Sequence, residues 1–176
     1  MRTDCINTSQ SELIRSCLTG EYELIWLIGT STGIRISDIL QLRAKQFLKS
    51  ETYIKEIKTG KRRRIYLSKE IRALAQERIN KYNIRPNERM FGKSRVQVWR
   101  VFKKAAQKCD INTNVGTHTM RKTYSKAYIE KGHTMDELQK RLNHKHINDT
   151  IGYITPNAAL GLDSQGYPKR KRGIKK

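Results

Sequence analysis

One switch in hydrophobic periodicity constrains the fold of this chain more than any other feature. Residues 52–57 and 63–67 alternate apolar and polar side chains with the period of a β-strand, and Thr59, Gly60 and Lys61 lie between them. This pattern predicts a β-hairpin, because a glycine-containing turn between two alternating segments is typical of that motif. The remaining patterned segments have helical spacing. The expected fold class is therefore α+β and mainly α, with a small antiparallel β-sheet.

Helices are expected on both sides of the hairpin. Ser9 and Glu12 form a capping-box pattern, and Thr134 and Glu137 form another. Cap residues and apolar spacing together predict helices at 9–18, 22–28, a short stretch from 37, 68–82, 94–108, 118–131, 135–142 and 147–154.

The chain length suits one domain with a short tail, since the sequence has 176 residues. We expect residues 1–154 to form this domain, because helical patterning continues to that point. From Thr155 the periodicity ends, and prolines and glycines accumulate. Residues 155–176 are interpreted as a mobile or partner-docking tail, and its basic run includes Lys169, Arg170, Lys171 and Arg172.

The net charge points to a polyanionic partner. Lys and Arg total 37 against 16 Asp and Glu, which gives a formal charge of +21 at pH 7. Such an excess binds phosphates by releasing counterions, so affinity should fall steeply with added salt. Charge alone does not separate a DNA enzyme from another basic protein, such as a ribosomal component.

The cysteines and the apolar runs favour a location in the cytoplasm. Cys5, Cys17 and Cys109 are an odd number without CxxC spacing, so neither a disulfide framework nor a zinc ribbon is indicated. The longest apolar run, 24–28, is too short to span a bilayer, and the N-terminus lacks the apolar region of a signal peptide. No membrane contact is expected.

Residues suited to phosphodiester chemistry occur as short pieces along the chain. Cutting such a bond without hydrolysis needs a nucleophile that stays attached, cations for the transition-state charge, and an acid for the leaving oxygen. The sequence supplies all three. The pieces are TGIRISD at 32–38, KTGK at 58–61, HTMR at 118–121, LNH at 142–144, and Tyr153.

The order and spacing of these pieces resemble the tyrosine recombinase (phage integrase) family, from about residue 9 to Tyr153. The resemblance implies the catalytic fold of that family and a chemistry that needs no metal, cofactor or ATP. The catalytic residues that it implies are Arg35, Lys58, His118, Arg121, His144 and, as nucleophile, Tyr153.

The resemblance also implies a role for each residue. Arg35 and Arg121, helped by His144, would hold the scissile phosphate. His118 would assist proton movement at Tyr153, which would attack to form a 3′-phosphotyrosine. The hairpin lysine would protonate the 5′-hydroxyl leaving group, and the 5′-hydroxyl of a second strand would reverse the step. Asp38, one helical turn after the first arginine, is expected to orient its guanidinium.

Local reasoning leaves several alternatives open. Lys61 is a rival to Lys58, and Tyr167 is an outside candidate for the nucleophile. A metal site is the weaker interpretation of four residues, His133, His144, His146 and Cys109, because histidines two residues apart chelate poorly without further ligands. The side chains expected to contact DNA are Lys61, Arg62, Lys122, Lys169, Arg170, Lys171 and Arg172.

The implied function is site-specific recombination of double-stranded DNA, by integration, excision or inversion, for a phage or other mobile element. The chain would assemble as a homotetramer on DNA, with the tail docked on a neighbouring protomer or on DNA. Accessory proteins that bend DNA would be further partners. The expected location is a bacterial or phage-infected cytoplasm, associated with the nucleoid. Two alternatives remain: a type IB topoisomerase-like enzyme, and a non-catalytic DNA-binding regulator or incomplete fragment on the same fold.

The sequence departs from the family pattern in three respects, one of which is Met120 in the HxxR motif, where leucine is common. Most members carry an N-terminal domain that closes a clamp around DNA, and no such segment is identified here. The third motif is Leu-Asn-His where Leu-Gly-His is usual, so Asn143 stands at a position where glycine would adopt a positive φ more easily.

Overall fold

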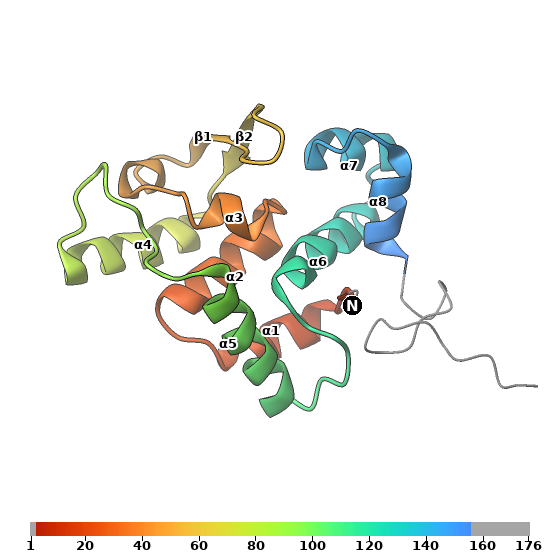
Figure 1. The fold of residues 1–176 in the computed structure, drawn as a ribbon, viewed down its shortest axis with the longest axis horizontal. Coiled ribbons are helices and arrows are strands. Elements are labelled where there is room, and N and C mark those ends of the chain that lie inside the picture. Colours follow the sequence, from red (N-terminus) through yellow and green to blue (C-terminus); the bar gives the residue numbers. More distant parts are fainter. Residues whose placement is uncertain (1–2, 156–176) are drawn as a thin grey trace, which may run out of the picture.

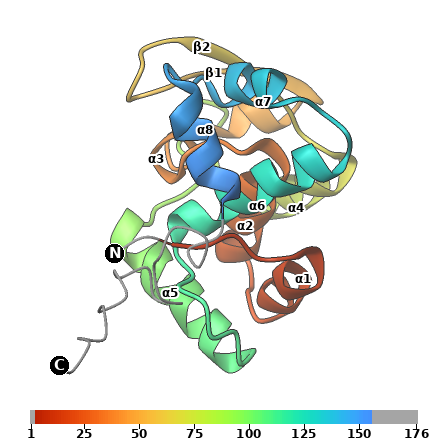
Figure 2. The ribbon, with the colours of Figure 1, turned by 90° about the vertical axis from the view of Figure 1, so that its right-hand side faces the viewer.

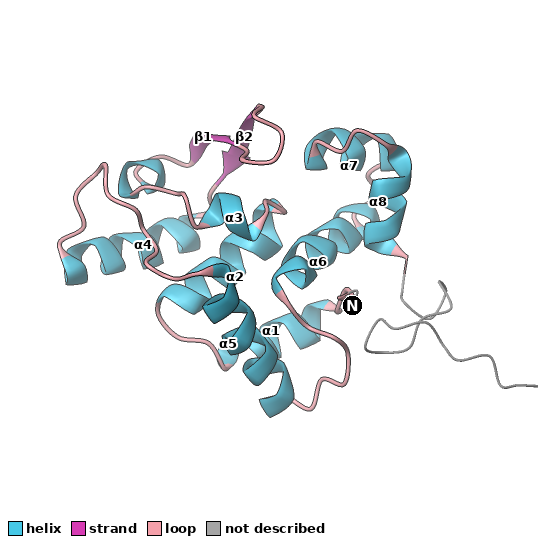
Figure 3. Cartoon of the chain, in the orientation of Figure 1, coloured by secondary structure: helices cyan, strands magenta, loops and turns pink. Residues whose placement is uncertain are grey.

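Helices predominate in residues 3–155, the part of the chain that this computed structural model describes (Figure 1, Figure 3). In chain order they are α1 (Thr8–Ser16), α2 (Glu21–Thr32), α3 (Ile36–Ile39), α4 (Lys69–Tyr82), α5 (Arg95–Lys108), α6 (Thr117–Glu130), α7 (Met135–Leu142) and α8 (Ile147–Ile154). A short 3-10 helix, η1 (Ala44–Phe47), precedes the strands β1 (Glu51–Lys55) and β2 (Arg62–Tyr66). The predicted α+β, mainly helical class is confirmed.

The predicted hairpin is present, with β1 antiparallel to β2 and Glu51 paired with Tyr66 at its open end. Strand alternation turns Ile54 and Ile65 toward the interior, where they are 6% and 1% exposed. The same alternation continues one step beyond β1, so that Glu56 is fully buried at the base of the turn. The hairpin therefore delivers a buried carboxylate as well as an exposed turn.

The central packing joins α2 to α6, and α4 covers α2 from another side. Trp26 of α2 contacts Phe102 of α5 edge to face, with ring centroids 4.9 Å apart. Gly29 lies directly against α6, because a Cβ at this position would lie 2.4 Å from the Sδ atom of Met120. Glycine thus permits the close approach of α2, which ends just before Arg35, to α6, which carries Arg121.

Helix starts follow the predictions with one correction. Ser68, Ser94 and the pair of Thr134 and Glu137 cap their helices as expected. The first capping box is instead formed two residues earlier, between Asn7 and Gln10. The Asn7 side chain accepts a bond from the Gln10 backbone at 2.8 Å, and the Gln10 side chain accepts one from the Asn7 backbone at 3.1 Å. Asparagine is as strong an N-cap as serine, so the earlier residue prevails.

A second, smaller hydrophobic cluster holds the C-terminal helices. Tyr124 of α6 packs with Leu138 and Leu142 of α7, and the partly buried Tyr128, Ile129 and Ile154 surround them. Figures 1 and 2 agree that α7 and the hairpin lie at one end of the molecule, while α1 and α5 lie at the other. The C-terminal pair of helices thus lies beside the hairpin turn.

Two further observations concern the predictions on cysteines and on membranes. The three cysteines are free thiols, although the Sγ atoms of Cys17 and Cys109, at the ends of α1 and α5, lie 3.3 Å apart. Within residues 3–155, no helix has the length and apolar character needed to cross a bilayer. The tail from residue 156 onward, with Tyr167 and the basic run 169–172, lies outside the described residues.

Candidate active site

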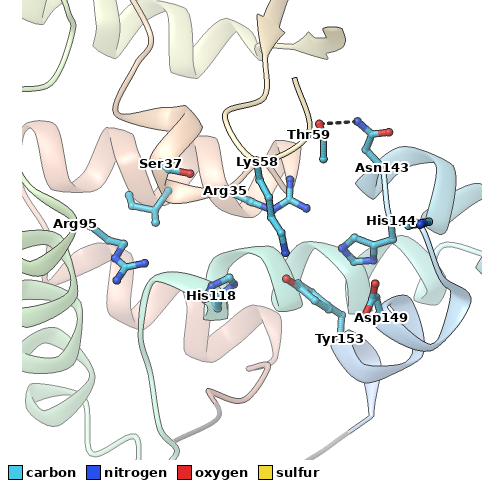
Figure 4. A pocket seen from close by; sticks show the side chains of 12 residues that line it. Arg35, Ser37, Lys58, Thr59, Arg95, His118, Asn143, His144, Asp149 and Tyr153 are labelled. Carbon is cyan, nitrogen blue, oxygen red and sulfur yellow. Dashed lines mark hydrogen bonds between the residues drawn. The ribbon is translucent and has the colours of Figure 1, made fainter. Parts of the chain in front are cut away.

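A cavity of about 430 Å³ opens between the hairpin turn, the start of α3, α6 and the α7–α8 pair (Figure 4). Five of the six predicted catalytic residues line it, namely Arg35, Lys58, His118, His144 and Tyr153. The sixth, Arg121, lies behind the cavity and is 1% exposed. Segments separated by more than a hundred residues therefore converge on one site, as their order in the sequence predicted.

Arg35 reaches the cavity because the backbone turns sharply before it. Gly33 ends α2 with φ of 64°, and a Cβ there would lie 2.3 Å from the ring of Tyr124, so only glycine fits. Arg35 is the N-cap residue of α3, and its Nη1 donates to the Glu56 carboxylate at 3.2 Å. Glu56 is the residue that orients Arg35.

The predicted role of Asp38 is therefore corrected. Its Oδ1 accepts a bond from the backbone N–H of Ile57 at 2.9 Å, and its only hydrogen bond to Arg35 runs from its own backbone N–H to the Arg35 carbonyl at 2.9 Å, not from the guanidinium to its carboxylate. Burial raises the pKa of Asp38, and the bond from Ile57 opposes that rise. Asp38 instead tethers the hairpin turn to α3, because the turn approaches the carboxylate more closely than the guanidinium does.

The turn presents Lys58 to the cavity. Gly60 N–H donates to the Glu56 carbonyl at 2.8 Å, which closes the turn, and the Thr59 hydroxyl donates to the Glu56 carboxylate at 2.8 Å. The Lys58 side chain extends into the cavity toward the hydroxyl of Tyr153 (Figure 4). Lys61 is exposed on the same turn and is absent from the cavity lining. This arrangement favours Lys58 over its rival.

Arg121 braces the site from within the protein. Its Nη1 donates to the Gly33 carbonyl at 2.5 Å and its Nη2 to the Leu142 carbonyl at 2.6 Å. Burial, with a smaller contribution from the charges of Arg35 and Arg63, lowers the pKa of Arg121 to about 10, so it remains protonated at neutral pH. The ends of α2 and α7 are thus joined through one buried cation.

The two histidines differ in their surroundings. His144 Nε2 lies 3.1 Å from Nη2 of Arg121, and its Nδ1 lies 3.0 Å from the hydroxyl of Thr150. A guanidinium only donates, so Nε2 accepts and Nδ1 carries the proton. Burial, together with the charges of Arg121 and Arg35, lowers the pKa of His144 to about 4. Desolvation and the same two arginines also lower the pKa of His118, although this residue is exposed at the mouth of the cavity.

Tyr153 projects from α8 between these groups. Its ring centroid lies 4.9 Å from that of His144 and 6.5 Å from that of His118. The Cζ atom of Arg121 lies 5.6 Å from the centre of the Tyr153 ring. A tyrosine hydroxyl, a lysine, two arginines and two neutral imidazoles therefore surround one cavity, a set suited to moving a phosphoryl group onto the tyrosine.

The predicted DNA contacts divide into three groups. Lys61 and Arg62 are exposed on the hairpin, and the Arg62 guanidinium stacks on Tyr53 with 4.7 Å from Cζ to the ring centre. Lys122 is 5% exposed, and its Nζ donates to the Thr3 carbonyl at 2.6 Å. Its contact with DNA stays a prediction. The basic residues of the tail lie outside the described range.

The alternative metal site is not assembled. The His133 ring stacks on Tyr128 with centroids 4.0 Å apart, whereas His144 faces Arg121 and Thr150. Within residues 3–155, no three His, Cys, Asp or Glu side chains come together in a group that could hold an ion.

Sequence reasoning missed several residues of the site. Arg95 lines the cavity from the first position of α5, and no local pattern distinguishes it from other surface arginines. Thr150 holds His144 from within α8. Glu56 had a signal, because strand alternation places it on the same face as Ile54. A charged residue on the buried face of a strand needs a partner of opposite charge.

The fold and the cavity define the catalytic domain of a tyrosine recombinase, an enzyme of site-specific DNA recombination. The sequence matches the phage integrase family over residues 4–159, and the chain belongs to that family. This assignment agrees with the resemblance carried by the five motifs.

Individual relatives support the assignment. The probable integrase/recombinase YoeC of Bacillus subtilis (strain 168) is 34% identical over 140 residues, which cover 74% of this chain and 75% of YoeC. The crystal structure of XerA recombinase matches with a TM-score of 0.74 at 16% identity, over 91% of this chain and 63% of that one. XerH bound to its difH substrate before cleavage matches with a TM-score of 0.73 at 19% identity, over 86% of this chain and 50% of XerH. This chain thus spans half to two thirds of those solved structures.

Proposed function

We propose that this chain cuts and rejoins DNA strands through a covalent 3′-phosphotyrosine link to Tyr153. The observation that carries the proposal is the position of Tyr153 in the cavity that Arg35 and Lys58 also line. A nucleophile that stays bound to the phosphate conserves the energy of the broken bond, so rejoining needs no external energy source.

The reaction balances with the groups present. The Tyr153 oxygen attacks the phosphorus atom, and its proton passes to His118, which is neutral at pH 7 because its pKa is lowered. The bond to the 5′ oxygen breaks, and Lys58 supplies the proton that makes this oxygen a hydroxyl. A 5′-hydroxyl, from the same or another strand, then attacks the phosphotyrosine and releases the tyrosine.

The cations stabilise the negative charge of the transition state. Arg35 uses Nη1 for Glu56, so its other N–H groups remain for the phosphate oxygens. Arg121 contributes a buried positive charge beneath the Tyr153 ring. His144 would turn from Arg121 to the phosphate when an anion enters, since the added negative charge raises the pKa of an imidazole.

DNA and further copies of the chain are the proposed partners. XerH was solved on its difH substrate and a lambda integrase as a dimer on a core site, which supports DNA as the ligand here. A tetramer on two sites, accessory DNA-bending proteins and a nucleoid-associated cytoplasmic location complete the proposal. Residues 1–154 would be the catalytic domain, and 155–176 would dock on a neighbouring protomer or on DNA.

A nicked duplex that loses its 5′ segment after cleavage tests the chemistry. Incubation without metal should give a covalent protein–DNA adduct that peptide mapping assigns to Tyr153, and Tyr153→Phe should give none. Tyr66→Phe, on the outer face of the hairpin, is the matched control and should form the adduct normally. Absence of an adduct with salt-sensitive binding would favour a regulator. Relaxation of supercoiled DNA that lacks any specific site would favour a topoisomerase.

A further inference from the structure

We infer that Glu56 is a positioning residue that, together with Asn143, holds the lysine turn, the first arginine and the histidine turn in one arrangement. The inference rests on the proposed function, because it assigns Glu56 an effect on catalysis exerted through Lys58 and Arg35. Neither Glu56 nor Asn143 is among the six residues predicted to be catalytic.

The contacts of Glu56 join elements that are remote in sequence. Its Oε2 accepts bonds from Arg35 Nη1 at 3.2 Å, from the Thr59 hydroxyl at 2.8 Å and from Asn143 Nδ2 at 3.0 Å. Its Oε1 lies 3.5 Å from Nη1 of Arg63. One carboxylate therefore links α3, the hairpin turn and the turn between α7 and α8 (Figure 4 shows Thr59 and Asn143 facing each other).

The electrostatics require this carboxylate to be ionised. Burial alone would raise the pKa of Glu56, but the bonds from Thr59 and Asn143 and the charges of Arg35 and Arg63 outweigh burial and lower it. The Glu56 side chain is 0% exposed, and that of Arg63 is 7% exposed. An uncharged side chain at this position would deprive two largely buried guanidinium groups of the carboxylate that pairs with them, which is costly for buried charges.

Asn143 serves two separable purposes. Its backbone has φ of 58°, in the left-handed region, and ends α7 immediately before His144. Glycine would adopt this conformation at least as easily. The side chain adds the bond to Glu56, which joins the histidine turn to the lysine turn. Asn143→Gly therefore removes the side-chain bond to Glu56 and retains the backbone conformation.

The cleavage test compares two substrates. The first, the oxygen substrate, is the ordinary nicked duplex. In the second, the sulfur substrate, sulfur replaces the bridging 5′ oxygen at the cut site, and a thiolate leaves without protonation. With the oxygen substrate at saturation, Asn143→Gly and Glu56→Gln should each slow adduct formation at Tyr153 about tenfold or more, as expected when a catalytic group is displaced. With the sulfur substrate most of the loss should disappear for Asn143→Gly, as it should for Lys58→Ala. Glu56→Gln should recover only in part, since it also releases Arg35.

Matched controls exist for both variants. Asn83 ends α4 with φ of 50°, so Asn83→Gly repeats the backbone change away from the cavity. Glu51 pairs with Arg64 on the exposed side of the hairpin, so Glu51→Gln repeats the charge change. Both controls should cleave like the parent protein. Equal losses in the control variants, or parental rates in Asn143→Gly and Glu56→Gln, would overturn the inference.

Hydrogen exchange separates this inference from the proposed function, because it needs no DNA. The Ile57 amide donates to the Asp38 carboxylate, and the Gly60 amide donates to the Glu56 carbonyl. Both amides should exchange faster in Asn143→Gly and in Glu56→Gln than in the parent, and at the parental rate in Asn83→Gly. Faster exchange without any adduct, even in the parent, would support the coupling and refute the strand-transfer chemistry. Unchanged exchange would refute the coupling.

Discussion

The two hydrophobic clusters of this domain differ in size and in the catalytic groups that they hold. The main core contains side chains from helices α1 through α6, from the hairpin and from η1. It fixes the segments that carry Arg35 and Lys58. The second cluster has three buried residues, Tyr124, Leu138 and Leu142, and it fixes α7 and α8. Tyr153, the proposed nucleophile, therefore stands on the less extensively packed region. Local opening costs less free energy where less apolar surface is buried, so α8 is expected to open more readily than the segments that carry Arg35 and Lys58.

Polar contacts compensate for the small second cluster. Arg121 donates to the Leu142 carbonyl, the Arg141 Nε donates to the Tyr124 hydroxyl at 3.0 Å, and His144 bonds with Thr150. Directional bonds of this kind fix the geometry but break one at a time. The C-terminal helices should therefore respond to single polar substitutions more strongly than the main core does.

The largest expected effect follows removal of the buried cation between the two regions. Arg121→Ala leaves the carbonyls of Gly33 and Leu142 without their partner, which should cost about 4 kcal/mol of unfolding free energy. Adduct formation should fall at least about a hundredfold, as when a donor to the transition state is lost. Denaturant titration and the suicide substrate measure the two effects. Arg62→Ala removes an exposed guanidinium as the control, and equal stability of the two variants would contradict the bracing role.

A pair of leucine substitutions compares the two clusters directly. Leu24→Ala in the main core should reduce the unfolding free energy by about 3 kcal/mol, because both transfer and cavity terms are lost. Leu142→Ala should reduce it by only about 1 kcal/mol if α7 and α8 open separately from the core. Amide exchange in 135–154 should nevertheless accelerate in Leu142→Ala and not in Leu24→Ala. Acceleration of exchange in 135–154 in both variants would mean that the domain unfolds as a single unit.

Acid should destabilise the second region before the first. His144 has a pKa of about 4 in the folded protein, below the ordinary value of about 6.5 for the unfolded chain. Between these values the unfolded chain binds a proton that the folded protein does not, so stability is complete above pH 6.5 and is lost as pH falls toward 4. The loss between pH 7 and 5 should be about 1 kcal/mol, allowing for the partial exposure of the ring.

The control for this pH dependence is His144→Asn. Asparagine retains a donor toward Thr150 and does not titrate, so the pH profile of unfolding should become flatter in this range. His146→Asn replaces an exposed histidine on the same turn and should keep the parental profile. An unchanged profile in His144→Asn would assign the acid sensitivity to other groups.

The sequence predicted the elements better than their mutual contacts. Caps and periodicity are local, so the helices and the hairpin were correctly predicted, and five of the six residues predicted to be catalytic line one cavity. The partner of Arg35 was wrongly predicted, because Asp38 is near in sequence whereas Glu56 approaches only after the hairpin folds back. The bond from Lys122 to the Thr3 carbonyl was not predicted, since its partner belongs to the remote N-terminal segment. Side-chain pairs between distant elements carry no local signal.

The smallest expected effect lies in the main region, at the start of α1. Asn7→Ala removes the side-chain acceptor for Gln10 N–H and should cost about 1 kcal/mol, the usual contribution of an N-cap. Ser9→Ala, at the cap position predicted from sequence, should change the unfolding free energy by no more than a few tenths of that value. Cleavage should be unaffected in both, because α1 contributes no residue to the cavity lining. A loss of adduct formation in Asn7→Ala would mean that the two regions are coupled more tightly than their separate clusters indicate.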